Sequence, residues 1–92
     1  MDIILSKDSK KFIEKLTAKQ AKQIVIKIKE LTLTPYPNDS KKLKGVQTEY
    51  YRVDVGEFRI IYEIEKENIL IILVGKRNDN KEYNQLKRKK WK

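Results

Sequence analysis

Three charged side chains, Arg52, Asp54 and Arg59, stand in two segments where polar and apolar residues alternate. A guanidinium group presents a fork of N–H donors that matches the oxygens of a phosphate group, and a carboxylate can accept a proton. Together these groups could bind a phosphate group and assist a proton transfer. Arg77 follows a later apolar segment by a few residues and could reach the same region.

The two segments are predicted to form a β-hairpin, because only Gly56-Glu57 separates them and glycine comes first. Such a turn pairs Asp54 with Arg59, and directly paired residues share a face of the sheet. One predicted face is apolar and should meet the helices: it carries Tyr51, Val53, Val55, Phe58, Ile60 and Tyr62. The opposite face carries Tyr50, Arg52, Asp54, Arg59, Ile61 and Glu63.

The remaining segments predict an α+β domain, in which two helices cover one face of an antiparallel sheet. Residues 3–6 predict an opening strand, and residues 7–16 predict a first helix with Ser6 as its N-cap. Residues 69–74 are apolar throughout, which is typical of a central strand covered on both faces, and Gly75 should end this strand.

The second helix has a clear beginning and end in the sequence. Thr17 and Gln20 fit a capping box, and the helix should end near Leu33, because Pro35 disfavours helical backbone at the residue before it. A loop is expected over residues 34–40. The predicted buried stripe consists of Ala21, Ile24, Val25, Ile28 and Leu31.

The chain length and its charge limit the class of protein. Ninety-two residues allow one small domain over residues 1–92, with a basic tail at about 84–92 and a possible short helix at 82–90. Lys and Arg total 22 against 13 Asp and Glu, which gives a net charge of +9. This excess predicts a polyanionic partner, which could be nucleic acid, an anionic membrane or an acidic protein, and nucleic acid is favoured. No apolar run approaches the roughly 20 residues of a membrane span, and no signal-peptide core is present, so we expect a cytoplasmic protein.

The chain contains no Cys and no His. A thiolate zinc site is therefore excluded, and both the most usual metal ligand and the most usual general base are missing. We expect neither a metal nor another cofactor. Any catalysis must use Asp, Glu, Lys, Arg or Tyr.

An ordered set of short motifs connects these elements to a known family. The motifs are Lys42-Leu43-Lys44-Gly45, Tyr51-Arg52-Val53, Gly56-Glu57-Phe58-Arg59-Ile60-Ile61-Tyr62, Val74-Gly75-Lys76-Arg77 and Tyr83. In this order and at these spacings the chain resembles the RelE/ParE superfamily of toxins from bacterial type II toxin–antitoxin pairs. The resemblance implies a RelE-like fold and a cognate antitoxin as partner.

The superfamily has two main activities, and the resemblance favours the first. RelE-like members cleave messenger RNA in the ribosomal A site, whereas ParE-like members inhibit DNA gyrase and are not nucleases. By position in the motifs, the residues associated with RelE-type function correspond to Arg52, Arg59, Arg77 and Tyr83 of this sequence. Asp54 departs from the best-known RelE pattern, which has a lysine here that is thought to act as the base. Other ribosome-dependent relatives use a carboxylate.

The resemblance implies metal-free RNA cleavage in which the neighbouring 2′-hydroxyl attacks the phosphate. Asp54 would be the base, Arg52 and Arg59 would bind phosphate oxygens, and Arg77 would stabilise the phosphate or the leaving group. Tyr83 would stack on a base or join the hydrogen-bond network. The expected partners are the antitoxin, the ribosome and messenger RNA, with no membrane. The expected nucleic-acid contacts are Lys10, Lys11, Lys19, Lys22, Lys42, Lys44 and Lys76.

Each of these residues also has a purely structural interpretation. Asp54 and Arg59 could form only a cross-strand ion pair, worth under about 1 kcal/mol if exposed. Tyr83 could pack the last segment onto the sheet, and the helical lysines could be ordinary solvated side chains. DNA gyrase inhibition, or nucleic-acid binding by an inactive relative, therefore remains open as the alternative function.

Overall fold

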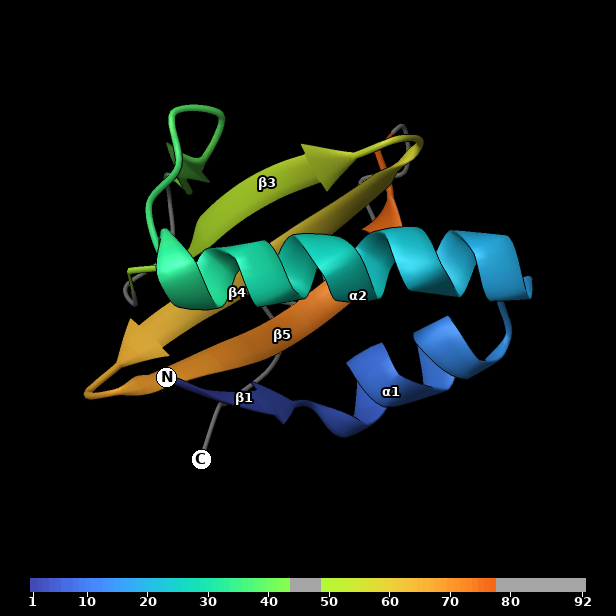
Figure 1. Cartoon of the computed structure of the whole chain (residues 1–92), viewed down its shortest axis with the longest axis horizontal. Helices are drawn as coiled ribbons and strands as arrows, with labels where there is room; N and C mark the ends of the chain where they lie inside the picture. Colours follow the sequence, from blue (N-terminus) through green and yellow to red (C-terminus); the bar gives the residue numbers. More distant parts are fainter. Residues whose placement is uncertain (44–48, 78–92) are drawn as a thin grey trace.

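The described part of the protein consists of a five-stranded sheet and two helices that cover one face of it (Figure 1). The computed structural model describes residues 1–43 and 49–77. The helix expected at residues 82–90 lies outside the described residues. The elements are β1 (Asp2–Leu5), α1 (Lys7–Glu14), α2 (Ala18–Leu33), β2 (Lys41–Lys42), β3 (Tyr51–Val55), β4 (Phe58–Glu65) and β5 (Asn68–Lys76).

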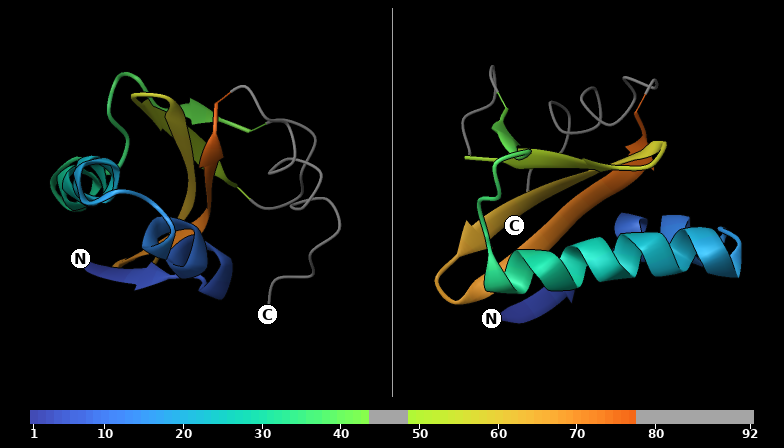
Figure 2. Two further views of the ribbon diagram at one scale, coloured as in Figure 1. Left: turned by 90° about the vertical axis from the view of Figure 1, so that its right-hand side faces the viewer. Right: turned by 45° about the horizontal axis from the view of Figure 1, so that its top comes forward.

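The sheet has the strand order β1-β5-β4-β3-β2. The strands from β2 to β5 pair antiparallel, which agrees with the sequence-based expectation. The sheet is nevertheless mixed, because β1 lies parallel to β5, with Ile3 opposite Ile69. Both helices lie on the same side of this sheet, as the left view of Figure 2 shows. The predicted α+β fold is therefore confirmed, with a parallel edge strand added.

Both helices begin at the caps that the sequence predicts. The Ser6 side chain accepts a hydrogen bond from the Ser9 N–H at the start of α1. At the start of α2, Thr17 and Gln20 form a capping box with two reciprocal bonds of 3.2 Å. α2 ends at Leu33 as expected, whereas α1 ends at Glu14, two residues before its predicted limit.

Two clusters of buried side chains lie on opposite faces of the sheet. The cluster under the helices joins Ile24, Ile28 and Leu31 of α2 to Val53, Phe58, Ile60, Tyr62, Ile69, Ile71 and Val74 of the sheet. The second cluster consists of Leu43, Tyr50, Ile61, Ile72 and Leu73. The strand at residues 69–74 is thus covered on both faces, as predicted, but it extends past Gly75 to Lys76.

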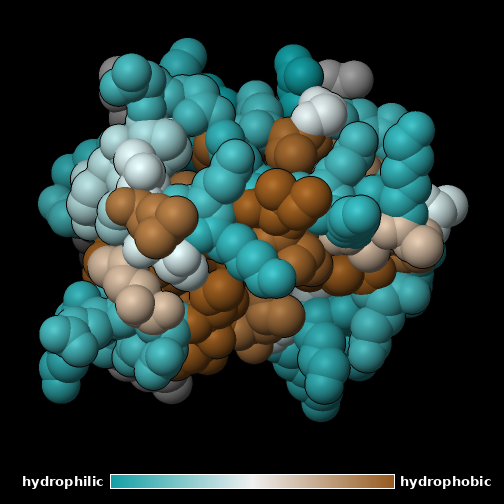
Figure 3. Space-filling view, in the orientation of Figure 1, coloured by the Kyte–Doolittle hydropathy of each residue, from teal (hydrophilic) through white to brown (hydrophobic). Residues whose placement is uncertain are grey.

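The buried stripe of α2 is narrower than predicted. Ile24, Ile28 and Leu31 are 0–3% exposed, but Val25 is 39% exposed. The physical reason is that only one narrow side of α2 contacts the sheet. Val25 follows Ile24 by one position and therefore points to a neighbouring side of the helix, away from the sheet. Figure 3 shows apolar side chains exposed on this side of the molecule. Over all described faces, the exposed large apolar side chains include Ile3, Ile4 and Leu5 of β1 and Val25, Ile26 and Leu33 of α2.

A β-bulge interrupts the pairing of β4 with β5. Ile61 lies opposite Leu73 but Tyr62 lies opposite Ile71, so Ile72 has no partner of its own. Two serines satisfy the carbonyl groups at this point: Ser6 Oγ donates to the Ile72 carbonyl at 2.7 Å, and Ser9 Oγ donates to the Ile71 carbonyl at 3.2 Å. Ser9 is fully buried. The first helix and the bulge are therefore joined by side-chain hydrogen bonds.

Candidate functional site

The β3–β4 hairpin has the predicted register. Asp54 lies opposite Arg59, and Arg52 lies opposite Ile61. Gly56 in the turn adopts φ +58°, a conformation that glycine allows at no steric cost. Val53, Phe58, Ile60 and Tyr62 are buried under the helices, so the charged residues lie on the other side of the sheet. We call that side the arginine face.

Asp54 is surrounded by three arginines. Its Oδ1 atom accepts a hydrogen bond from Arg59 Nε at 2.9 Å. Its Oδ2 atom lies 3.6 Å from Arg77 Nε and 3.9 Å from Arg52 Nη1. We call these four residues the arginine cluster. The sequence-based prediction that Arg77 reaches the Asp54 region is therefore confirmed.

The turn of the hairpin holds Arg77 in place. The Arg77 backbone N–H donates to the Glu57 carbonyl at 2.9 Å, and Arg77 Nη1 donates to the Gly56 carbonyl at 3.1 Å. The bulge at Ile72 contributes as well, because it reverses the alternation along β5. Ile69 and Ile71 face the helices. In a strand without the bulge, every second residue would point to the same side, so Arg77 would face the helices as well.

The cluster is partly exposed and carries an excess of positive charge. The side chains of Arg59, Arg52, Asp54 and Arg77 are 14%, 24%, 34% and 50% exposed. Three guanidinium groups surround one carboxylate, so the four side chains together carry a net charge of +2. Among residues 1–43 and 49–77 there is no group of three or more acidic side chains that could hold a metal ion. The arrangement can bind a phosphate group and stabilise extra negative charge on it.

The lysines of the helices lie in a different layer from the arginine cluster. Lys10 and Lys11 belong to α1, and Lys19 and Lys22 belong to α2; all four are exposed. α2 begins beside the β3–β4 turn, where Gln20 donates to Glu57. The lysines near that end of α2 therefore lie at the same end of the molecule as the cluster, but across the sheet from it.

The other expected nucleic-acid contacts that the structure describes, Lys42 and Lys76, lie on the helix side of the sheet and not on the arginine face. Lys42 lies opposite Tyr51, on the helix side of the sheet, and pairs with Glu49 at 3.2 Å. Lys76 is exposed and lies opposite Phe58 on that same side. Lys44 and Tyr83 lie outside the described residues.

One basic residue of the arginine face was missed by the sequence-based prediction. Lys41 lies directly opposite Arg52. Its placement depends on β2, a strand of two charged residues that has no apolar alternation to reveal it. Only the pairing with β3 places this lysine.

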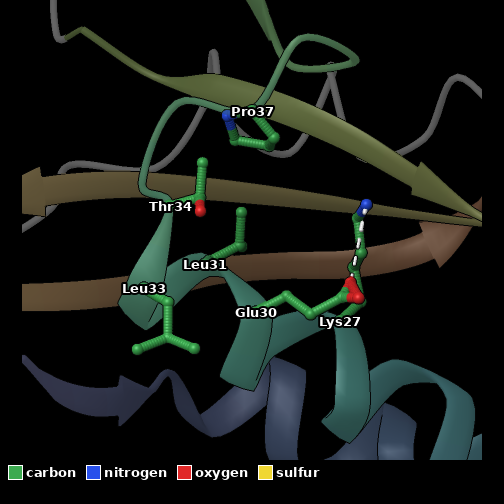
Figure 4. A pocket seen from close by; sticks show the side chains of 6 residues that line it. All are labelled: Lys27, Glu30, Leu31, Leu33, Thr34 and Pro37. Carbon is green, nitrogen blue, oxygen red and sulfur yellow. Dashed lines mark ion pairs between the residues drawn. The ribbon is translucent and has the colours of Figure 1, made fainter.

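A pocket of about 280 Å³ lies at the other end of α2, away from the cluster (Figure 4). It is lined by Lys27, Glu30, Leu31, Leu33, Thr34 and Pro37. Lys27 pairs there with Asp39 at 3.0 Å and approaches Glu30 at 3.9 Å. The Lys27–Asp39 pair joins α2 to the loop that follows it, so we interpret the pocket as part of a structural junction.

A match to a family model places the chain in a family. Residues 3–81 match the family model described as the ParE toxin of the type II toxin–antitoxin system parDE. The chain belongs to the RelE/ParE superfamily of toxins. It is accordingly a toxin of a toxin–antitoxin pair. No curated protein matches the sequence of this toxin.

Solved structures of RelE toxins share the fold of this toxin. A variant of Escherichia coli RelE in the free state matches with a TM-score of 0.77 at 21% identity, over 95% of this chain and 94% of that one. The toxin of the Pyrococcus horikoshii RelE–RelB complex matches with a TM-score of 0.72 at 23% identity, over 83% of this chain and 93% of that one. The toxin of the Methanococcus jannaschii RelB–RelE complex matches with a TM-score of 0.67 at 28% identity, over 87% of this chain and 96% of that one.

No helix among the described residues of the toxin is both long enough and apolar enough to cross a membrane.

Proposed function

We propose that this toxin is a ribosome-dependent endoribonuclease that cleaves messenger RNA in the ribosomal A site and thereby inhibits translation. The observation that carries the proposal is the arginine cluster, in which Arg52, Arg59 and Arg77 converge on Asp54 on one face of the sheet. A cluster of this composition suits a substrate that is itself an anion and gains charge during the reaction.

The proposed reaction is an internal transfer within the RNA. The 2′-hydroxyl oxygen forms a bond to the adjacent phosphorus atom, and the bond from phosphorus to the 5′-oxygen breaks. The proton leaves the 2′-hydroxyl for a base, and another proton reaches the departing 5′-oxygen. The products are a 2′,3′-cyclic phosphate, or its hydrolysed form, and a 5′-hydroxyl end.

The cluster supplies most of what this reaction needs. Arg59 and Arg77 would stabilise the phosphorane, whose charge exceeds that of the bound phosphate, and Arg52 would hold a phosphate oxygen. Asp54 would accept the proton, or would hold the arginines while a ribosomal group or a water accepts it. Tyr83, which lies outside the described residues, would stack on a base or join the hydrogen-bond network. The ribosome would position the messenger RNA, so the toxin need not bind the substrate precisely by itself.

Primer extension on a defined messenger RNA in a purified translation system tests the proposal. Cuts at fixed positions within A-site codons, present with ribosomes and absent without them, are the expected result. Intact messenger RNA, together with arrested translation or inhibited growth, would overturn it.

DNA gyrase inhibition is the second candidate, because the matching family model is described as the ParE toxin of parDE. In that case the arginine face would bind a protein and no RNA would be cut. A DNA supercoiling assay with purified gyrase distinguishes the two functions. Inhibited supercoiling with intact messenger RNA would favour gyrase as the target.

We further propose that a cognate antitoxin binds the toxin and covers its basic sheet face or displaces its C-terminal segment. Several of the solved relatives were crystallised as complexes with RelB antitoxins. A net charge of +9 on 92 residues also favours an acidic or amphipathic partner. Co-purification with the product of the adjacent gene is expected, and failure to associate at micromolar concentrations would contradict it.

A further inference from the structure

Lys41 lies on the arginine face but has no role in the proposed reaction. It lies directly opposite Arg52 in the pairing of β2 with β3, and directly paired residues share a face. Leu43, two residues further along the chain, is only 6% exposed and packs with Tyr50 and Ile61 on that same face. Residues two apart in a strand point to the same side of the sheet. The position of Leu43 therefore also places Lys41 on the arginine face, in agreement with its pairing with Arg52.

Lys41 and its neighbour Lys42 differ in their electrostatic surroundings. Lys42 lies on the other side of the strand and pairs with Glu49 at 3.2 Å. Lys41 is exposed, and within residues 1–43 and 49–77 no carboxylate forms an ion pair with it. Among the described residues, its exposed ammonium group therefore has no anionic side chain as a partner and is accessible to an external anion.

The spacing of the strands places Lys41 beside the arginine cluster. Neighbouring strands lie about 4.8 Å apart, so Lys41 stands one strand beyond Arg52 and two beyond Arg59. A lysine is a flexible point charge that suits a phosphate group without demanding one geometry. Among the described strands, β2 is an edge of the sheet.

We propose that Lys41 binds a phosphate of the RNA backbone next to the phosphate that is cleaved. This inference rests on the proposed placement of RNA on the arginine face. The contact is made to the backbone and not to a base, so it is independent of sequence and contributes to binding more than to the chemical step.

The test uses the full-length toxin and a fluorescently labelled 12-nucleotide RNA whose 2′-hydroxyls are methylated, so that it cannot be cleaved. Its affinity is measured by anisotropy over a series of salt concentrations. One lost phosphate contact should reduce the log–log salt slope by about 0.7 in Lys41→Gln. Lys41→Arg should restore the slope. The matched control is Lys29→Gln, which removes the same charge from an exposed position on α2 and should leave the slope unchanged.

An unchanged slope in Lys41→Gln, an equal loss in Lys29→Gln, or no binding of the probe by the wild-type toxin would overturn the inference.

Cleavage on ribosomes separates this inference from the proposed function. We expect Lys41→Gln to raise the half-saturating toxin concentration while the maximal rate stays the same. If the wild type does not cleave but Lys41→Gln still flattens the slope, the nuclease proposal fails and the Lys41 contact stands.

Discussion

Asp54 and Arg59 are joined across the β3–β4 hairpin by a hydrogen bond of 2.9 Å from Arg59 Nε to Asp54 Oδ1. The pair is more than a strand contact, because Arg52 and Arg77 approach the other oxygen of the same carboxylate. Asp54 therefore holds three cations in one place whether or not it takes a proton. Substituting Asp54 therefore tests this positioning as well as the proposed proton transfer.

We expect Asp54→Asn to lower the cleavage rate by less than about 100-fold, the lower end of what a general base contributes, because a water or a ribosomal group can replace the base. Asp54→Lys restores the residue of the better-known RelE pattern, so it should keep or raise activity. The same change should lower stability by about 1 kcal/mol, because it places a fourth cation among three arginines. Single-turnover rates and urea unfolding measure both effects. A rate loss for Asp54→Asn above that for Arg59→Ala would contradict this expectation.

The hairpin site could be predicted from the sequence because its determinants are local. Gly56-Glu57 fixes the turn, the turn fixes the register, and the register brings Asp54 to Arg59. The caps at Ser6 and Thr17 are local signals of the same kind.

The features that the sequence did not reveal depend on partners far along the chain. The parallel pairing of β1 depends on β5, and β2 consists of two lysines with no alternation. The bulge at Ile72 lies in a run of apolar residues. In such a run no polar residue marks the side that faces solvent, so a change in the alternation leaves no signal in the sequence. That bulge is also what places Arg77 on the arginine face, so the sequence could indicate only that Arg77 lies nearby.

Replacing Lys10, Lys11, Lys19 and Lys22 together by Gln should flatten the salt dependence of ribosome or RNA binding. Each lost phosphate contact should reduce the log–log slope by about 0.7 to 0.9. The fold should persist, because all four side chains are exposed. Binding over a salt series, with circular dichroism as the folding control, measures the effect. An identical slope would mean that these lysines are only solvated helix residues.

Tyr62→Phe should lower stability at pH 7 by about 1 kcal/mol, because the buried hydroxyl donates to the Pro35 carbonyl at 2.7 Å. Burial raises the pKa of Tyr62 above its ordinary value of 10.0. The folded chain therefore keeps this proton where the unfolded chain loses it, so stability falls as pH rises above about 10. Urea unfolding between pH 7 and 11 should show a shallower alkaline decline in Tyr62→Phe. An equal decline in both proteins would assign it to other groups.

Ser6→Ala should destabilise the fold by about 2 kcal/mol, because it removes both the N-cap of α1 and the hydrogen bond to the Ile72 carbonyl. Thr17→Ala removes only an exposed cap and should cost about 1 kcal/mol. Urea unfolding of the two variants makes the comparison. Equal losses would show that the bulge does not depend on the serine.

The central claim is that the arginine cluster is the active site of a ribosome-dependent ribonuclease, and single-turnover cleavage on ribosomes with a defined A-site codon tests it most directly. Removing a well-placed donor to a developing charge commonly costs about 100- to 1000-fold in rate. We predict losses of this size for Arg59→Ala and for Arg77→Ala, with the fold retained and with the Lys29→Gln control as active as the wild type. Full activity in both arginine variants would contradict the account and would leave the Asp54–Arg59 pair as a strand contact alone.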